Sequence, residues 1–237
     1  MITLHCSGPT FGLPEASPYV TKTEVQLQML GVRYDKARAD LEKSPKGQMP
    51  YIRDEDMVIG DSHFIREHLE KKLGRDLDEG LDARQRAEAW AIERMLENHF
   101  TPTVTWARWL IPENFAKGPA HFFDGAPEHL RAKLREEVLA RVTMTHRAWG
   151  VSRHTQDEIV SLAGRSLTAL EAVLGDKPYL FGEKPVGVDA TAFAVLAAAL
   201  TPFFDSPIRR KAESYPTLVA YTARMMARYY PGHAWQA

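Results

Sequence analysis

The sequence predicts a small α/β domain followed by a larger all-helical domain. Over residues 1–74 short β-rich segments alternate with amphipathic helical segments, which is the order that builds a compact α/β unit. After Gly74 a polar stretch leads into long segments of helical periodicity, with no further pair of strands evident. We therefore expect an α/β domain over residues 1–75, a linker over 76–81 and an all-α domain over 82–237.

The first strand and helix are predicted from composition and capping residues. Residues 1–6 are β-rich, and "SGPTFGLPEAS" after them carries two Gly and two Pro, which is typical of a loop. A helix is expected to begin at Pro18, because a missing N–H costs nothing in the first turn, with Ser17 as its cap. Gly31 is expected to end that helix.

A second strand, a hairpin and a second helix complete the α/β unit. The strand is expected around residues 33–39, followed by the loop "LEKSPKGQ". "MPYIRD" and "MVIGD" read as a hairpin whose turn is the acidic segment 54–56. Ser62 precedes a helical pattern that repeats every four residues and ends at Gly74.

The second part of the chain shows only helical periodicity. One long helix runs from about residue 87 towards Trp109, until the Pro- and Gly-containing segment 111–128 interrupts it. The helix within 187–203 is apolar nearly all round, which predicts that it is buried. Three further amphipathic helices are expected over 129–150, 155–175 and 215–230.

Composition excludes several classes of protein. The net charge of −1 offers no basic surplus for a phosphate backbone, so nucleic acid is not expected as a partner. A single cysteine, Cys6, rules out an intrachain disulfide and fits a reducing compartment. The first residues do not read as a signal peptide, and the longest apolar run, 190–200, is too short to span a bilayer. We expect a soluble, cytoplasmic protein.

Several short stretches together resemble the glutathione transferase superfamily. They are "SPYVTK", "SPKGQMPYI", "IGDSHFIREHL", "YLFGEKPVGVDAT" and "SYPTLVAY". Each is weak alone, but their order and separations over nearly the whole chain are specific, with 112–128 matching least clearly. Within the superfamily the chain looks most like the branch that contains the failed-axon-connections proteins and the metaxins. The resemblance implies a thioredoxin-like N-terminal domain followed by the all-helical glutathione-transferase C-terminal domain.

The resemblance assigns a role to the segment before the third strand. In the family, the proline there is held cis, which would apply to Pro50; without the resemblance a trans bond would be the better interpretation, since only about 5–6% of X-Pro bonds are cis. The bend would leave the Met49 N–H and C=O free to pair with the cysteinyl part of glutathione, as an added strand does. Gln48 matches a position that often faces the glycine carboxylate.

The pair Asp61 and Ser62 matches the acid and serine that receive the γ-glutamyl end of glutathione in this family. The Ser62 hydroxyl, its N–H and the helix start suit the α-carboxylate, and Asp61 suits the α-ammonium. The competing interpretation is that Ser62 only caps its helix. The two roles are compatible with each other.

Ser17 is the catalytic candidate that the resemblance implies. The family activates the glutathione thiol with Tyr, Ser or Cys near the start of the first helix, and "SPY" resembles the "CPF" or "CPY" of the cysteine-using branches. The competing interpretation is a plain N-cap serine, and Tyr19, inside the helix, is a poorer candidate. With serine in place of cysteine no mixed disulfide forms, so thiol transfer and dehydroascorbate-type reduction are not expected. Cys6 reads as a small buried apolar residue.

The helical domain is expected to supply the pocket for the electrophile. Trp106 and Trp109 are the candidates, with Phe122 and Phe123 in the irregular segment, although such aromatic residues are more often part of a core. Asp189 matches an acid at the start of the family's buried helix, while Val186 stands where a hydroxyl is usual. Half of a capping box is therefore missing, and Asp189 is expected to bond backbone N–H groups.

We expect a glutathione S-transferase-like protein that conjugates the glutathione thiolate to an apolar electrophile. Glutathione would be the co-substrate, no metal is expected because the histidines lack ligand spacing, and family analogy implies a homodimer. The alternative is a non-catalytic binding or assembly module of the metaxin type. A third, weaker interpretation is a glutathione-dependent isomerase or reductive dehalogenase.

Overall fold

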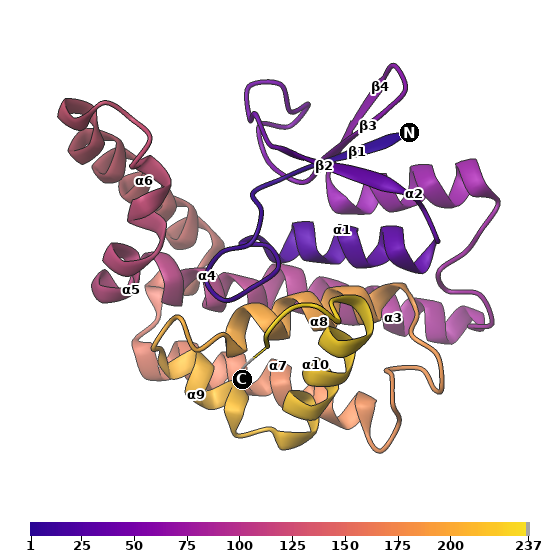
Figure 1. Cartoon of the computed structure of the whole chain (residues 1–237). Helices are drawn as coiled ribbons and strands as arrows, with labels where there is room; N and C mark the ends of the chain where they lie inside the picture. Colours follow the sequence, from indigo (N-terminus) through magenta and orange to yellow (C-terminus); the bar gives the residue numbers. More distant parts are fainter. Residues whose placement is uncertain (236–237) are drawn as a thin grey trace.

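The computed structural model describes residues 1–235 and contains one four-stranded sheet and a bundle of helices (Figure 1). The strand order is β2-β1-β3-β4, in which β1 pairs in parallel with β2, and the other neighbours pair antiparallel. This arrangement confirms the predicted thioredoxin-like domain. The strands are β1 (Ile2–Cys6), β2 (Tyr34–Arg38), β3 (Tyr51–Asp54) and β4 (Met57–Gly60).

Two helices, α1 (Pro18–Met29) and α2 (Ser62–Leu73), cover one face of the sheet. They bury a separate apolar core against the strands; its members are Ile2, Leu4, Cys6, Val20, Leu27, Leu30, Ile52, Ile65, Leu69 and Leu77. Gly74 adopts the left-handed conformation, which a glycine accepts without steric cost, and so ends α2 as predicted. Residues 74–82 connect α2 to the helical bundle, and the domain limits at 75 and 82 stay a prediction.

The rest of the described chain is helical, as the sequence predicts. Its main core contains buried side chains from most of these helices. The helices are α3 (Ala83–Met95), η1 (Leu96–Phe100), α4 (Thr101–Trp109), α5 (Pro112–Lys117), η2 (Pro119–Phe123), α6 (Glu128–Trp149), η3 (Val151–Arg153), α7 (Gln156–Leu174), α8 (Gly187–Leu200), α9 (Pro207–Glu213) and α10 (Pro216–Tyr229).

Three local features differ from the sequence-based expectation. The long helix predicted towards Trp109 contains the π-helical turn η1. The sequence did not predict this turn, because a single wider turn leaves the apolar periodicity on either side almost unchanged. The segment expected to be irregular contains the short helices α5 and η2. Helix α9 was not predicted, because its seven residues are too few to display a helical period.

Helix α8 lies in the middle of the bundle, and every one of its residues is buried, as predicted. The Asp189 carboxylate accepts hydrogen bonds from the N–H groups of Val186 (2.8 Å) and Leu180 (3.0 Å). The Tyr221 hydroxyl donates a third at 2.8 Å. Asp189 therefore ties α8 to the preceding turn and to α10, and confirms the expected bonding to backbone N–H groups.

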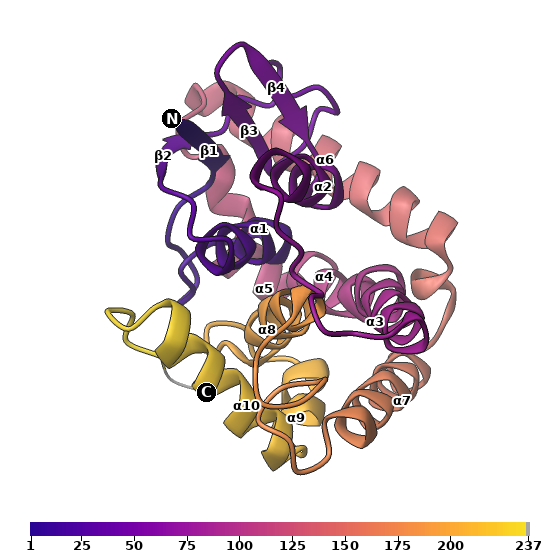
Figure 2. The same cartoon turned by 90° about the vertical axis from the view of Figure 1, so that its right-hand side faces the viewer.

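Helix α1 is enclosed between the sheet and the helical bundle. Val20 and Leu27 belong to the core beneath the sheet, whereas Val25 belongs to the core of the bundle. Figure 2 shows α1 lying between α2 with the strands on one side and α8 on the other. As a result, polar residues of α1 such as Lys22 and Gln26 are buried as well, although the sequence places them on a polar side.

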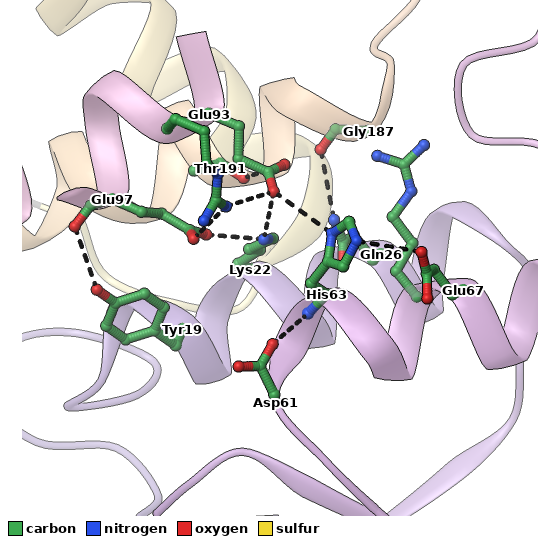
Figure 3. Close-up of polar contacts among 12 residues, drawn as sticks. Tyr19, Lys22, Gln26, Asp61, His63, Glu67, Glu93, Glu97, Gly187 and Thr191 are labelled. Carbon is green, nitrogen blue, oxygen red and sulfur yellow. Dashed lines mark hydrogen bonds and ion pairs between the residues drawn. The ribbon is translucent and has the colours of Figure 1, made fainter. Parts of the chain in front are cut away.

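Buried Lys22 pairs with two carboxylates of the bundle (Figure 3). Its Nζ lies 2.7 Å from Glu97 and 3.2 Å from Glu93, and Arg94 Nη2 contacts the same two residues at 2.6 and 2.8 Å. Thr191 donates a further hydrogen bond to Glu93. Burial would raise the pKa of Glu93, but the charge and hydrogen bond of Lys22 outweigh it, so this pKa lies below its ordinary value. The Glu93 carboxylate is thus held ionised at the domain contact.

We expect Lys22→Met to destabilise the protein by about 3 kcal/mol, because it leaves two buried carboxylates with Arg94 as the one remaining cation in residues 1–235 that pairs with both. Urea denaturation measures the loss. The matched control is Arg84→Met, whose exposed pair with Glu88 is expected to contribute less than about 1 kcal/mol. Equal losses in the two variants would contradict the role of the buried network.

A second charged contact fixes α2 to the sheet. The carboxylate of Asp54, at the end of β3, is 1% exposed and lies 2.7 Å from His68 Nε2 and 2.8 Å from Lys72 Nζ. Burial raises the pKa of Asp54, but hydrogen bonds from His68 and Lys72 lower it more, so the pKa lies below its ordinary value. Ionised Asp54 therefore stabilises the packing of α2.

This pKa shift gives stability a defined pH dependence. Because the folded-state pKa of Asp54 lies below the unfolded value of about 3.9, its contribution is complete above that pH and is lost as pH falls through the folded-state pKa. We expect Asp54→Asn to cost about 2 kcal/mol at neutral pH, and the difference from the wild type to shrink below about pH 4. Denaturant unfolding across this pH range tests it, with Asp56→Asn in the exposed turn as the control. A pH-independent difference would contradict the assignment.

Candidate functional site

The strand register brings three predicted site segments to one end of the sheet. His5 near the end of β1 pairs with Tyr51 at the start of β3, and Tyr51 pairs with Gly60 at the end of β4. The N–H of Asp61 then donates to the carbonyl of Pro50 at 3.1 Å. The turn before β3 and the start of α2 are therefore adjacent, at the sheet end from which the chain leaves β1 for α1.

The Met49-Pro50 peptide bond is cis, as the resemblance implied. Within the described residues, the N–H and C=O of Met49 take part in no hydrogen bond. The loop before it is held by buried Ser44, whose hydroxyl donates to the Gln48 carbonyl at 2.6 Å and accepts from the Gln48 N–H at 3.2 Å. The side chain of Gln48 is exposed. This segment thus presents free backbone groups at Met49 on a fixed turn.

Asp61, rather than Ser62, is the N-cap of α2, which corrects the interpretation of Ser62 as a cap. The Asp61 carboxylate accepts from the His63 N–H at 2.9 Å (Figure 3), and Ser62 is the buried first residue of the helix. Asp61 has a φ of 81°, a conformation that costs free energy for a residue with a side chain. Strain of this kind concentrates at functional sites.

A cation stands near the second oxygen of Asp61. Lys46 Nζ lies 3.9 Å from Asp61 Oδ2 and 4.0 Å from the centre of the Phe64 ring. The two charged side chains are both partly exposed, so the pair is weak and open to exchange with a ligand. The start of α2 therefore offers one carboxylate, one ammonium and the free N–H groups of a helix N-terminus.

Ser17 is the N-cap residue of α1 by position, with φ −93° and ψ 125°, but its hydroxyl caps nothing. Its Oγ makes no hydrogen bond to the first turn, so a ligand would not compete with a structural role. Tyr19 points away towards the bundle, where its hydroxyl donates to the Glu97 carbonyl at 3.5 Å (Figure 3). Burial and the Glu97 charge raise the pKa of Tyr19, which disfavours it as a source of phenolate.

The loop that leads to Ser17 is attached to the helical bundle. Phe11, at a φ of 58°, packs against Phe204, Phe203 and Phe122, and the Thr201 hydroxyl donates to the Phe11 carbonyl at 2.6 Å. Within the loop, buried Glu15 accepts from Ser7 Oγ and the Gly8 N–H. These contacts give an otherwise Gly- and Pro-rich segment a defined path into α1.

Comparison with known proteins identifies the family. The chain is 31% identical to an isoprene-epoxide–glutathione S-transferase from a Rhodococcus strain, over 97% of this chain and 99% of that protein. It is also 31% identical to the failed axon connections protein of Drosophila melanogaster, over 92% of this chain but only 56% of that protein. Mouse metaxin-2 is 26% identical over 79% of this chain and 72% of that protein.

The chain belongs to the glutathione S-transferase family. Two models of this family match it, the N-terminal domain over residues 18–114 and the C-terminal domain over residues 163–225.

Solved structures show the same fold at lower sequence identity. A beta-etherase from Sphingobium superimposes with a TM-score of 0.66 at 19% identity, covering 96% of this chain and 95% of that one. A glutathione transferase from Populus trichocarpa superimposes with a TM-score of 0.63 at 13% identity, covering 99% and 100%. At these identities the likeness establishes the two-domain transferase fold.

The two tryptophans that the sequence places in an electrophile pocket have different surroundings. Trp106 is half-buried against the core of the bundle. Trp109 lies 6.1 Å, between ring centres, from both Phe115 and Phe122. Phe122 also contacts Phe11 of the first loop. Trp109 therefore belongs to an aromatic group that reaches the loop before Ser17, whereas Trp106 has the environment of a core residue.

Cys6 is buried on β1 as expected. Burial, with the nearby Glu15 carboxylate, raises the pKa of the Cys6 thiol to about 12, so it is not a nucleophile at neutral pH. Residues 1–235 hold no group of three or more His, Cys, Asp or Glu side chains that could bind a metal ion. No helix in the same range is both long and apolar enough to cross a bilayer.

Arg108 was not among the site residues expected from the sequence. Its guanidinium donates a hydrogen bond to the Ala16 carbonyl next to Ser17. A signal for it was present, because Val104 and Arg108 are four residues apart and share one face of α4. Val104 is buried, and Arg108 on the same face of α4 is buried as well. A charge on an apolar helix face is uncommon enough to mark a position with a specific role.

Proposed function

We propose that this transferase-family chain binds glutathione along the sheet end and conjugates its thiolate to an apolar electrophile. The free N–H and C=O of Met49 would pair with the cysteinyl main chain. Asp61 would take the α-ammonium, and Ser62 with the start of α2 the α-carboxylate. Gln48 would face the glycine carboxylate.

The observation that carries this proposal is the convergence of unused polar groups at one place. Within residues 1–235, the Met49 backbone and the Ser17 hydroxyl have no partners that a ligand would have to displace. At the α2 N-terminus the side-chain cap from Asp61 takes up only the His63 N–H. A helix N-terminus favours an anion such as the α-carboxylate. The isoprene-epoxide–glutathione S-transferase from Rhodococcus matches this chain over nearly its whole length. This match also supports the proposal.

Ser17 is the residue proposed to stabilise the thiolate. A free thiol has a pKa of about 8.5 and is mostly protonated at neutral pH. A hydrogen bond to a charged group contributes roughly 1.5–3 kcal/mol, and each pKa unit corresponds to about 1.4 kcal/mol. The Ser17 hydroxyl together with the N-terminus of α1 would therefore lower the thiol pKa by about one to two units.

A small epoxide is the first electrophile to assay, given the relative's name. The thiolate sulfur would form a bond to one ring carbon, the carbon–oxygen bond would break, and the alkoxide would take a proton from solvent to give an alcohol. Trp109 and Phe122 would form part of the electrophile wall, and Trp106 stays a second candidate. We further propose a cytoplasmic homodimer.

A non-catalytic binding module of the metaxin type is the second candidate. The matches to failed axon connections and to metaxin-2 favour it, because they extend over 92% and 79% of this chain. Glutathione binding and turnover discriminate the two functions. A chain that neither binds glutathione nor conjugates it would support the module.

We expect Asp61→Asn to weaken glutathione binding at least tenfold while leaving stability within about 0.5 kcal/mol of the wild type. Asparagine caps a helix as well as aspartate and tolerates a positive φ, so only the negative charge for the α-ammonium is lost. Isothermal titration with glutathione and urea denaturation measure the two effects.

The matched control for this variant is Asp82→Asn, which makes the same change at the N-cap of α3, where Asp82 accepts from the Gln85 N–H. It should alter neither binding nor stability appreciably. Unchanged glutathione affinity in Asp61→Asn would remove Asp61 from the ammonium site.

We expect Ser17→Ala to lower the rate of conjugation by about 10-fold at neutral pH, because loss of the hydroxyl's part of the shift raises the thiol pKa by about one unit. Stability should change little, since the hydroxyl forms no cap. The pH dependence of conjugation to a chromogenic electrophile measures the shift.

Ser206→Ala is the control, because Ser206 does cap α9 through the Arg209 N–H. It should lose about 1 kcal/mol of stability and no activity. If Ser17→Ala behaved like this control, with lost stability and full activity, Ser17 would be a structural cap only.

A further inference from the structure

Within residues 1–235, Arg108 is a buried cation without a carboxylate partner. It lies on α4 and is 7% exposed; its Nη1 donates to the Ala16 carbonyl at 2.9 Å and its Nη2 to the Ala198 carbonyl at 2.7 Å. The Phe204 ring centre lies 5.1 Å from the guanidinium carbon. Burial lowers the pKa of Arg108 to about 10, so the side chain is still charged at neutral pH.

The other cations buried at the domain contact are neutralised. Lys22 pairs with Glu93 and Glu97, and Arg66 pairs with Glu70 and Asp78. Within residues 1–235 Arg108 has only carbonyl oxygens as hydrogen-bond partners. The Ala198 carbonyl stands near the C-terminus of α8, where the helix dipole favours a cation without cancelling its full charge. An unneutralised positive field therefore remains inside the protein.

That field acts next to Ser17. The carbonyl that Arg108 Nη1 contacts belongs to the Ala16–Ser17 peptide, and the Ser17 N–H is part of the same group. A cation on the oxygen draws electron density from the nitrogen and makes the N–H a stronger donor. In the described part of the chain the Ser17 N–H has no backbone acceptor, and the Ser17 hydroxyl caps nothing.

The contact also determines where Ser17 lies. The hydrogen bond joins α4 of the bundle to the last residue of the loop before Ser17, across 92 positions of sequence. Thr201 attaches Phe11 of the same loop to the end of α8. Arg108 therefore fixes the Ser17 end of this loop relative to the helical domain.

We propose that Arg108 is a positioning residue that acts through the Ala16–Ser17 peptide: it aims the Ser17 N–H and hydroxyl at the thiol of bound glutathione and supplies the positive field that favours the thiolate. This rests on the proposed function. The residue touches neither the thiol nor the electrophile. Its effect is on the ionisation of the thiol rather than on the binding of the tripeptide.

The test is to measure the thiol pKa of glutathione bound to the full chain. The ultraviolet absorbance of the thiolate is recorded as pH is raised. We expect Arg108→Met to raise this pKa by about one unit, and Arg108→Lys to keep most of the wild-type value because the charge remains. Affinity for S-methylglutathione, which has no thiol, should stay within about twofold in both variants.

Arg209→Met is the matched control. Arg209 Nη1 also contacts a carbonyl, that of Pro202, but its Nη2 pairs with Glu213 and it has no contact with the loop before Ser17. This variant should leave the thiol pKa unchanged. An unchanged pKa in Arg108→Met, with S-methylglutathione still bound, would overturn the inference and leave the proposed function standing.

A second measurement keeps the inference testable if Arg108→Met does not fold. In Ser17→Ala the backbone N–H and Arg108 are retained, so the bound thiol should still titrate about one unit below the free value of about 8.5. A bound thiol that titrates at the free value in this variant would overturn the role of Arg108. Absence of glutathione binding by the wild type would overturn both this inference and the proposed function.

Discussion

The burial of α1 on two sides is the constraint on which the rest of the structure depends. One face completes the core under the sheet and the other completes the core of the bundle, so the two domains share this helix. A helix enclosed in this way has no solvent-facing side for its polar residues. Lys22 is therefore stabilised by carboxylates of the bundle, and the domains are joined by charge as well as by apolar contact.

The same enclosure determines the candidate site. Because α1 cannot shift without breaking both cores, the position of its first turn is set, and Ser17 is placed by helix packing and by the loop that precedes it. That loop is attached to the bundle through Phe11 and Ala16. In the proposed function, the thioredoxin-like domain supplies the groups for the tripeptide, while the helical domain controls the surroundings of the thiol. Each domain is needed for a different part of the proposed chemistry.

Helix α2 provides the other half of the site. The hydrogen bond of Asp54 with His68 and its ion pair with Lys72 hold the helix on the sheet. Asp61 can then serve as cap and remain partly open to a ligand, because only one of its oxygens is used by the His63 N–H. Family membership is consistent with this arrangement. The relatives include both a transferase and proteins of the metaxin group. The side chains and backbone groups at the site, rather than the fold, therefore discriminate between the two functions.

The sequence by itself determined the order of strands and helices, the buried nature of α8 and, through family motifs, the cis bond before Pro50. These features are local or periodic: capping residues, glycines and apolar spacing act within a few residues. It did not predict η1 or α9, because one wide turn or seven residues leave too little periodic signal. It also assigned the cap of α2 to Ser62, one residue too late.

Only the tertiary structure decided which polar residues are buried and with what partners. Lys22 meets Glu93 and Glu97, and Arg108 meets Ala16, across tens of positions of sequence. Such pairs depend on how whole helices pack, and a side chain's burial is set by the element that covers it. A local pattern gives at most a hint of burial, as the spacing of Val104 and Arg108 does, and it does not identify the partner.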